Sequence, residues 1–232
     1  MIAAVVNAVV VVLGGLIGLL FGGRLQEAHT KTIVAGLGIC VMVIGITSAI
    51  ETSNILIVIL CIALGTVLGE LLRIEDRLDS LGDWLKARLG RHGGSRFTEG
   101  FVTASLLFCV GSMAIMGSFD AGLRGDYQTI FAKSALDGVM AVTFAATMGV
   151  GVLFSGGTVL LYQGTLTLLA SLVEPLLSPE VIVELSAVGG VMLIGTGINI
   201  LGLAPQRLKV GNMLPAMVLP VVWFALSGWF GG

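Results

Sequence analysis

The chain has 232 residues, of which 56% are hydrophobic and 11% are charged, and its formal net charge is −2. Soluble domains carry about 25% charged residues, so this composition excludes an ordinary soluble domain and predicts an all-α integral membrane protein. The sequence has no basic patch interleaved with aromatic residues, which argues against binding to nucleic acid.

Eight apolar stretches are long enough to cross a bilayer, because about 20 helical residues span the ~30 Å hydrocarbon core. The breaks near residues 51–53 and 155–157 are very short, so a count of seven spans is the alternative. No basic residue precedes the first stretch, so we expect a retained span and not a signal peptide. The expected spans are residues 2–22, 32–50, 54–72, 99–119, 133–155, 158–175, 181–203 and 213–230.

Basic residues are distributed unequally between the expected loops. Loops 23–31, 73–98 and 204–212 contain ten of the 12 Lys and Arg residues, and the opposite side has only Arg124 and Lys133. Short loops rich in Lys and Arg stay in the cytoplasm. We therefore expect one polytopic domain over residues 1–232, with both termini outside.

Residues 73–91, within the 73–98 loop, alternate apolar and charged residues at helical spacing. Ile74, Leu78 and Leu81 begin the apolar series, and charged residues lie between them. This pattern predicts an amphipathic helix at the cytoplasmic surface. Two interpretations remain open: a solvated connector, or a helix that binds lipid or a partner protein.

Glycines four residues apart in the first span, Gly14 and Gly18, predict a face where another helix packs closely. Asn7 falls on that face because seven residues are almost two helical turns. Asn199 lies one turn after a glycine in the seventh span. Either asparagine could bond a neighbouring helix or contact a ligand.

A short internal similarity suggests a repeat. Residues 41–45, VMVIG, resemble residues 191–195, VMLIG, 150 positions later. In the topology above these segments run in opposite directions, so the repeat would be inverted and would relate spans 1–3 to spans 6–8. Inverted repeats are typical of transporters. A match of Cys40-Val41 with Cys109-Val110 would imply a parallel relation instead.

Residues 109–138 form the most polar stretch between two long apolar runs. In the fourth span, two Gly-Ser pairs contribute Ser112 and Ser118, and such pairs are places where helices kink. Opened backbone is tolerated at membrane depth only where it lines a cavity or is buried in protein. We therefore list Ser112 and Ser118 as candidate site residues.

The fifth span begins either near Asp126 or near Lys133. Lys133 and Asp137 are four residues apart, so they share a helix face and can pair. Ionisable residues inside a membrane are costly and mark functional sites by default. We expect Asp137 to bind a cation or carry a proton, with Lys133 as its partner and Asp120 and Asp126 at the mouth of the site. The alternative is a structural salt bridge.

Several segments carry a family resemblance. CVGSMAIMGSFDAGLRGD, followed by KSALDG and MGVGVLFSGG, resembles the YdfK/YqgA-type family of small bacterial membrane proteins of unknown function. The similarity extends over most of the chain and includes LGTVLGELLRIED. It implies a protein of the bacterial inner membrane and implies no substrate.

Motifs for ATP binding, GxxxxGK[ST], and for hydrolases, HExxH and GxSxG, are absent. We therefore expect no enzyme, no cofactor and no metal. The best hypothesis is a secondary transporter or channel-like carrier of a small solute or ion, with a polar site at the junction of spans 4 and 5. Its partners would be the lipid bilayer, the solute and a second copy of the chain. The alternative is a non-transporting structural or regulatory partner that acts through the amphipathic helix.

Overall fold

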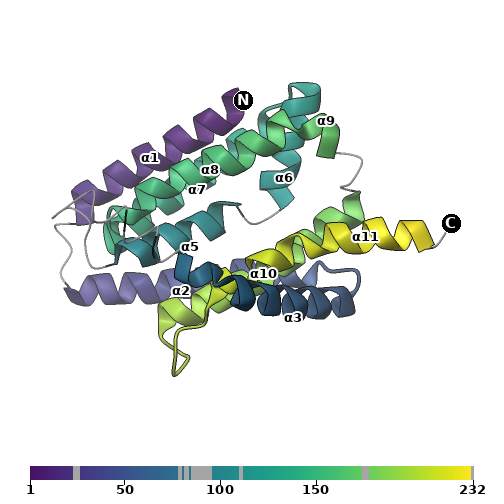
Figure 1. Ribbon diagram of the computed structural model, residues 1–232. Helices are drawn as coiled ribbons and strands as arrows, with labels where there is room; N and C mark the ends of the chain where they lie inside the picture. The colour runs from purple at the N-terminus through teal and green to yellow at the C-terminus, as the bar shows by residue number, and fades with distance from the viewer. Residues whose placement is uncertain are drawn as a thin grey trace. The chain divides into compact units, whose positions relative to one another are not determined.

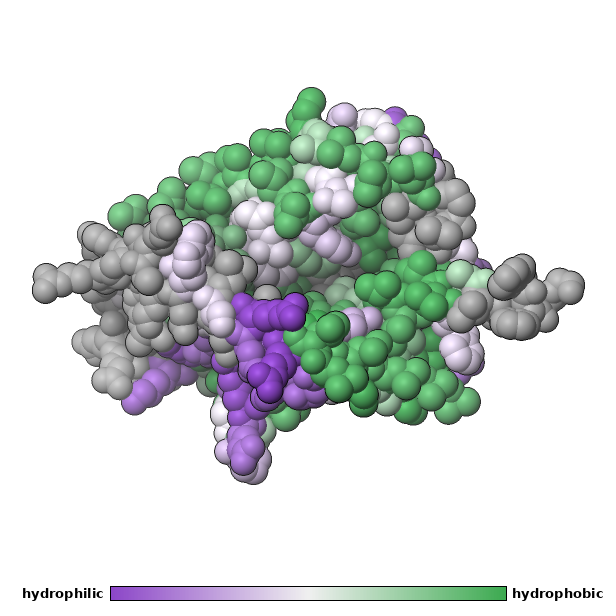
Figure 2. All heavy atoms as spheres, viewed as in Figure 1, coloured by the Kyte–Doolittle hydropathy of each residue, from purple (hydrophilic) through white to green (hydrophobic). Residues whose placement is uncertain are grey.

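The structure, a computed structural model, describes residues 1–22, 27–77, 80, 84, 96–109, 112–173 and 178–230. Within these residues all regular structure is helical (Figure 1). Apolar residues cover most of the coloured surface in Figure 2, as expected for helices that contact lipid. The predicted all-α membrane class is therefore confirmed.

Among the described residues, five helices are long and apolar enough to cross a membrane, and six are if a bent pair forms one span. The bent pair is α5, Phe97–Cys109, with α6, Ser112–Phe119, which the short π-helix η2, Asp120–Arg124, follows. The five are α1 (Ile2–Gly22), Lys31–Ile50 within α2 (Glu27–Ile50), α3 (Ile55–Leu72), α7 (Gln128–Met148) and α10 (Pro179–Leu201).

Two further apolar segments do not meet that criterion. The helix α8, Gly151–Leu168, contains Gln163 and several small polar residues, and the short α9, Ala170–Val173, follows it. The last segment is divided into the 3-10 helix η4, Val210–Met217, and the helix α11, Leu219–Phe230. The finer count of eight spans therefore remains a prediction.

The predicted break between the fifth and sixth spans was wrong. The sequence placed it at residues 155–157, whereas α7 ends before Gly149 and α8 runs through Gly156. Gly149 has φ of 85°, a conformation that favours glycine, so the chain turns there. Gly156 stays helical because its bare surface packs on the Ala8 carbonyl of α1.

Other helix ends follow local signals in the sequence. Asn54 caps α3 by accepting from the Leu56 N–H, and Ser178 caps α10 ahead of Pro179. Of the two starts expected for the fifth span, Asp126 and Lys133, the structure agrees with the first. There the Asp126 carboxylate accepts from the Gln128 N–H at 3.0 Å, where α7 begins.

The chain divides into two compact units. Unit 1 comprises residues Met1–Leu37, Asp79–Cys109 and Met113–Ser171, and unit 2 comprises Gly38–Leu78, Val110–Ser112 and Leu172–Gly232. Each unit is described by itself below. The prediction of a single polytopic domain stays a prediction.

In unit 1, α1 packs along α7 in the same direction. Gly14 lies against the Gly138 carbonyl, and Gly22 lies against the Ala146 carbonyl, so both residue numbers rise together. A Cβ on Gly14 would lie 2.5 Å from the Gly138 oxygen. The glycine face predicted on the first span is therefore the surface that lets the two backbones meet.

The helix α8 also packs in unit 1, against α1 and α5. It runs antiparallel to α1, because Gly156 lies near Ala8 whereas Gly164 lies near Met1. It runs parallel to α5. Near the start of α5, Phe97 packs on Phe154 of α8, and later in α5 the Ser105 hydroxyl donates to Thr158, which is also later in α8.

In unit 2, α2 and α10 are antiparallel. On α2 and α10, Gly45 lies against Gly190, and Gly38 lies against Leu201. The buried core combines α3, α10 and η4, with Ile57, Val58 and Cys61 of α3 among its members.

The helices α3 and η4 are also antiparallel. Gly65 lies against Ala216, and Gly69 lies against the Asn212 carbonyl, so one number falls as the other rises. The residues that follow α3 also bond to η4. The Glu75 carboxylate accepts from the Gly211 N–H at 2.6 Å, and Arg207 lies 3.3 Å from the same carboxylate.

The predicted amphipathic helix over 73–91 is only partly covered. Residues 74–77 are helical, and Ser80 and Trp84 are described individually. The remainder of that segment, and with it most of the prediction for 73–98, lies outside the described residues.

Candidate polar site in unit 1

A buried polar cluster joins three helices of unit 1. The Asp137 Oδ2 atom on α7 accepts from Lys133 Nζ at 2.5 Å and from Asn7 Nδ2 on α1 at 3.0 Å. The same Asn7 amide donates to Gln163 Oε1 on α8 at 3.1 Å. Asn7 and Gln163 are fully buried, and the side chains of Lys133 and Asp137 are 7% and 9% exposed.

The close approach of α1 and α7 explains how Asn7 reaches Asp137. Asn7 shares a helix face with Gly14 and Gly18, both of which lie against the α7 backbone. Val10, three residues after Asn7 on α1, lies against Gly138, the residue after Asp137. The predicted i, i+4 pairing of Lys133 and Asp137 is present on α7.

Several buried polar atoms of unit 1 have no hydrogen-bond partner among the described residues. They are Asn7 Oδ1, Gln163 Nε2 and Thr167 Oγ1, all in unit 1. Thr167 follows Gln163 by one turn of α8, on the same face. Buried polar atoms are nearly always paired, so unpaired ones call for an explanation such as a water, an ion or a ligand.

The cluster therefore combines a balanced ion pair with unused hydrogen-bonding capacity. The Asn7 carbonyl is an unused acceptor, and the Gln163 amide nitrogen holds two unused donors. Within the described part of the chain, no group of three or more His, Cys, Asp and Glu side chains could hold a metal ion. The arrangement is suited to binding a small polar group or to exchanging a proton.

The other candidate residues lie elsewhere. Asp120 pairs with Arg124 at 2.7 Å within η2, and the Ser118 hydroxyl donates to the Ala114 carbonyl of its own helix. The Asn199 amide uses both polar ends on the backbone of Leu208, each at 2.8 Å. The side chain of Ser112 lies outside the described residues.

The predicted location at the junction of spans 4 and 5 stays a prediction, because residues 110 and 111 of the fourth span lie outside the described residues. Among the described side chains, the partners of Asp137 come from α1 and α7, and α8 completes the cluster. The reason is the small-residue face of α7, which α1 covers.

Sequence reasoning missed Gln163. It lies in the expected sixth span, where we considered only charged residues and asparagines. Ser155, Gln163 and Thr167 recur at multiples of four residues along α8, and all three are buried. A search for any polar side chain at helical spacing within an apolar stretch would have found this face.

A second buried carboxylate lies in unit 2 and was also missed. Glu184 on α10 is 1% exposed. It accepts from Thr52 Oγ1 at 2.6 Å, from the Ser53 N–H at 2.9 Å and from the Asn54 N–H at 3.1 Å. These donors belong to the turn between α2 and α3, so Glu184 closes that turn at the N-terminus of α3.

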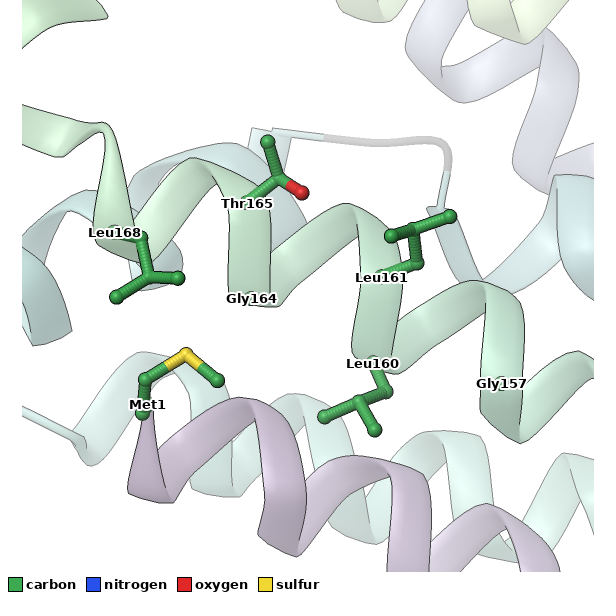
Figure 3. A pocket seen from close by; sticks show the side chains of 7 residues that line it. All are labelled: Met1, Gly157, Leu160, Leu161, Gly164, Thr165 and Leu168. Atoms are coloured by element: carbon green, nitrogen blue, oxygen red, sulfur yellow. The ribbon is translucent and has the colours of Figure 1, made fainter.

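An open groove lies on unit 1 between the start of α1 and α8 (Figure 3). Its volume is about 410 Å³, and Met1 faces Gly164 across it. Thr165 is the one residue with a polar side chain in a lining that is otherwise Met1, Gly157, Leu160, Leu161, Gly164 and Leu168. Such an apolar surface can contact lipid but offers little chemistry to a polar solute.

Comparison with known proteins agrees with the family resemblance. A family model described as "Protein of unknown function (DUF554)" matches residues 2–225. The chain belongs to the DUF554 family. An uncharacterized membrane protein, YdfK, of Bacillus subtilis (strain 168) is 28% identical over 235 residues, covering 100% of this chain and 99% of the relative. No solved structure matches the chain.

A second relative of this DUF554 chain is the uncharacterized protein YqgA of Escherichia coli (strain K12). It is 33% identical over 232 residues, which cover 97% of each chain. The predicted YdfK/YqgA-type family is thus confirmed over the full length. The chain is a multi-pass membrane protein with bacterial homologues, and the lipid bilayer is its surroundings.

Proposed function

We propose that this protein is a secondary transporter or channel-like carrier of a small solute or ion, in the bacterial inner membrane. Its substrate contacts the polar cluster of Asn7, Lys133, Asp137 and Gln163. The observation that carries the proposal is the set of unpaired buried polar atoms, Asn7 Oδ1 and Gln163 Nε2, beside a buried ion pair.

A purely structural role explains this arrangement less well. A polar network that only stabilises a fold gains most when every member is paired, and a partly paired network is worse than an apolar core. Here the amides of Asn7 and Gln163 each use one end and leave the other unused. A bound ligand would supply hydrogen-bond partners for those atoms, and a transferred proton could pass between them.

The proposal includes eight membrane crossings with both termini outside. In an eight-span chain, the odd-numbered spans run opposite to the even-numbered ones. Counting α5 with α6 as the fourth span and η4 with α11 as the eighth, the first and fifth spans are parallel, as are the fourth and sixth. The pairs 1–6, 2–7 and 3–8 are antiparallel. All five pair directions are those that eight crossings require, which supports the proposal.

The same contacts support an inverted repeat of spans 1–3 and 6–8. The repeat would relate α1 to α8, α2 to α10 and α3 to η4 with α11. Each of these pairs is in direct antiparallel contact within its own unit. The parallel contact of α1 with α7 also has a counterpart in the parallel contact of α8 with α5. Inverted repeats with a polar site in helices near the membrane centre are a transporter architecture.

The test is transport by variants of Asp137. The chain is expressed in a bacterial strain from which its own DUF554 relative is deleted, and growth and uptake are measured across a panel of small solutes. We expect the wild type to restore a solute-dependent phenotype and Asp137→Asn to lose it at equal amounts in the membrane. Glu51→Gln is the matched control, because Glu51 is an exposed carboxylate in the turn after α2, away from the cluster residues.

Normal transport by Asp137→Asn would contradict the proposal and favour a structural ion pair. The competing hypothesis, a non-transporting partner protein, depends on the segment 73–91. It predicts that disruption of this segment, and not of Asp137, removes the phenotype.

A further inference from the structure

We propose that the cluster of Asn7, Lys133, Asp137 and Gln163 binds a small solute of zero net charge that carries both a hydrogen-bond donor and an acceptor. A zwitterion such as glycine and a neutral primary amide such as acetamide share this chemistry. The inference rests on the proposed transport function and specifies the class of its substrate.

The charge balance of the cluster supports a solute without net charge. Lys133 and Asp137 form a pair within 2.5 Å, and the neighbouring side chains, Asn7 and Gln163, are neutral. A buried charge is tolerated when an opposite charge or hydrogen bonds compensate it. A monovalent cation or anion entering this balanced site would add a charge that nothing there compensates.

The unused atoms define the hydrogen bonds that the solute makes. Both bonds to the carboxylate of Asp137 go to Oδ2, so Oδ1 accepts none within the described residues. Together with Asn7 Oδ1 it offers acceptors for an ammonium or amide N–H group. Gln163 Nε2 offers donors for a carboxylate or carbonyl oxygen of the same solute.

The geometry disfavours a bare metal cation at this place. Na⁺ or a divalent ion would require several oxygen ligands, as hard cations do. The ammonium of Lys133 already occupies Asp137 Oδ2, and its positive charge would repel a second cation at the same carboxylate. A solute that brings its own donor and acceptor meets the same atoms without that repulsion.

The experiment uses the full-length protein, purified in detergent, and four probes of similar size. They are glycine, acetamide, ethylammonium chloride and sodium acetate, compared at equal ionic strength by the shift of the melting temperature. A ligand that binds only the folded state raises the melting temperature. We expect glycine or acetamide to raise it, and which of the two does so distinguishes a zwitterionic from a neutral solute. We expect ethylammonium and acetate to have no such effect.

The variant Gln163→Met removes the unused donors but keeps an unbranched side chain of similar length. Its melting temperature without ligand should stay close to that of the wild type, because the unpaired amide nitrogen is removed while the bond that Oε1 accepts from Asn7 is lost. The shift caused by glycine or acetamide should be lost as well. The control is Ser155→Ala, which alters a buried hydroxyl on the same face of α8 that bonds only its own helix and should keep the shift.

Three results would overturn the inference. One is a larger shift with ethylammonium or acetate than with both neutral probes, another is no shift with any of the four, and the third is a full shift in Gln163→Met. Each leaves the transport proposal to its own test, because loss of transport in Asp137→Asn does not depend on the net charge of the solute.

Discussion

Asp137 of unit 1 and Glu184 of unit 2 are both buried carboxylates, but their hydrogen-bond partners differ. Glu184 in unit 2 receives three hydrogen bonds from one turn, at the N-terminal end of α3. Asp137 in unit 1 is bonded to a lysine of its own helix and to an asparagine of another helix, and polar atoms beside it remain unpaired. Both lie in helices rich in apolar residues.

The comparison separates a structural carboxylate from a candidate functional one. The donors around Glu184 come from a single short loop, so its bonds fix the connection between α2 and α3. The groups around Asp137 come from three helices, and some of their polar atoms make no hydrogen bond between the helices. We infer that burial of an acidic residue does not by itself mark a site. Unpaired atoms on side chains that are hydrogen-bonded to the carboxylate or to its partners are the more useful sign.

The largest expected effect is on the ion pair. Asp137→Asn leaves the buried ammonium of Lys133 without its counter-charge and should cost about 3–5 kcal/mol of unfolding free energy. The double variant Lys133→Met, Asp137→Asn should recover most of that loss and still lack transport. Unfolding in mixed detergent micelles measures the stability of both variants, and solute uptake measures their transport. Equal stability of wild type and single variant would show that the pair is not desolvated.

Glu184 provides the opposite case. Glu184→Ala leaves donors of residues 52–54 without an acceptor, and we expect a loss of about 2–4 kcal/mol, since water reaches part of this turn. Glu184→Gln keeps one acceptor and should lose roughly half as much. Solute uptake per folded molecule should be unchanged in both variants. A selective loss of uptake with normal stability would move Glu184 into the functional class.

Helix spacing around the site gives a smaller effect. A Cβ at Gly18 would overlap the Val142 carbonyl of α7, so Gly18→Ala should separate α1 from α7 and cost about 1–3 kcal/mol. Gly157→Ala is the control on α8. Nothing lies within 4 Å of its added methyl group, and it should be neutral or stabilising by up to about 1 kcal/mol. Similar losses in both would argue against the close α1–α7 contact.

The topology test is read from thiol accessibility and gives the smallest expected change in stability. In a cysteine-free background, Ser80→Cys should be protected from a membrane-impermeant thiol reagent in whole cells, whereas Asp126→Cys should react. Asp126 is preferred to Gly125, whose φ of 66° would strain a side chain. Labelling in the reverse pattern would overturn the orientation with both termini outside.

The sequence by itself determined the features that depend on neighbours along the chain. Composition and the length of the apolar stretches set the helical membrane class. Asn54, Ser178 and Pro179 mark helix starts because capping involves only the adjacent turn. The pairing of Lys133 with Asp137 is likewise a property of one helix, since residues four apart share a face.

Only the tertiary structure decided which helices meet at that pair. Periodicity shows that Asn7 and Gln163 lie on particular faces, but the helix that covers a face depends on how all the helices pack. The sequence allowed Gly156 either to end a helix or to pack against another helix. In the structure it lies within α8 and packs against the Ala8 carbonyl of α1. Ser118 was equally eligible for a site, yet its hydroxyl bonds its own helix. The site is formed by residues 130 and 156 positions from Asn7, and contacts over such separations depend on packing that no local sequence signal encodes.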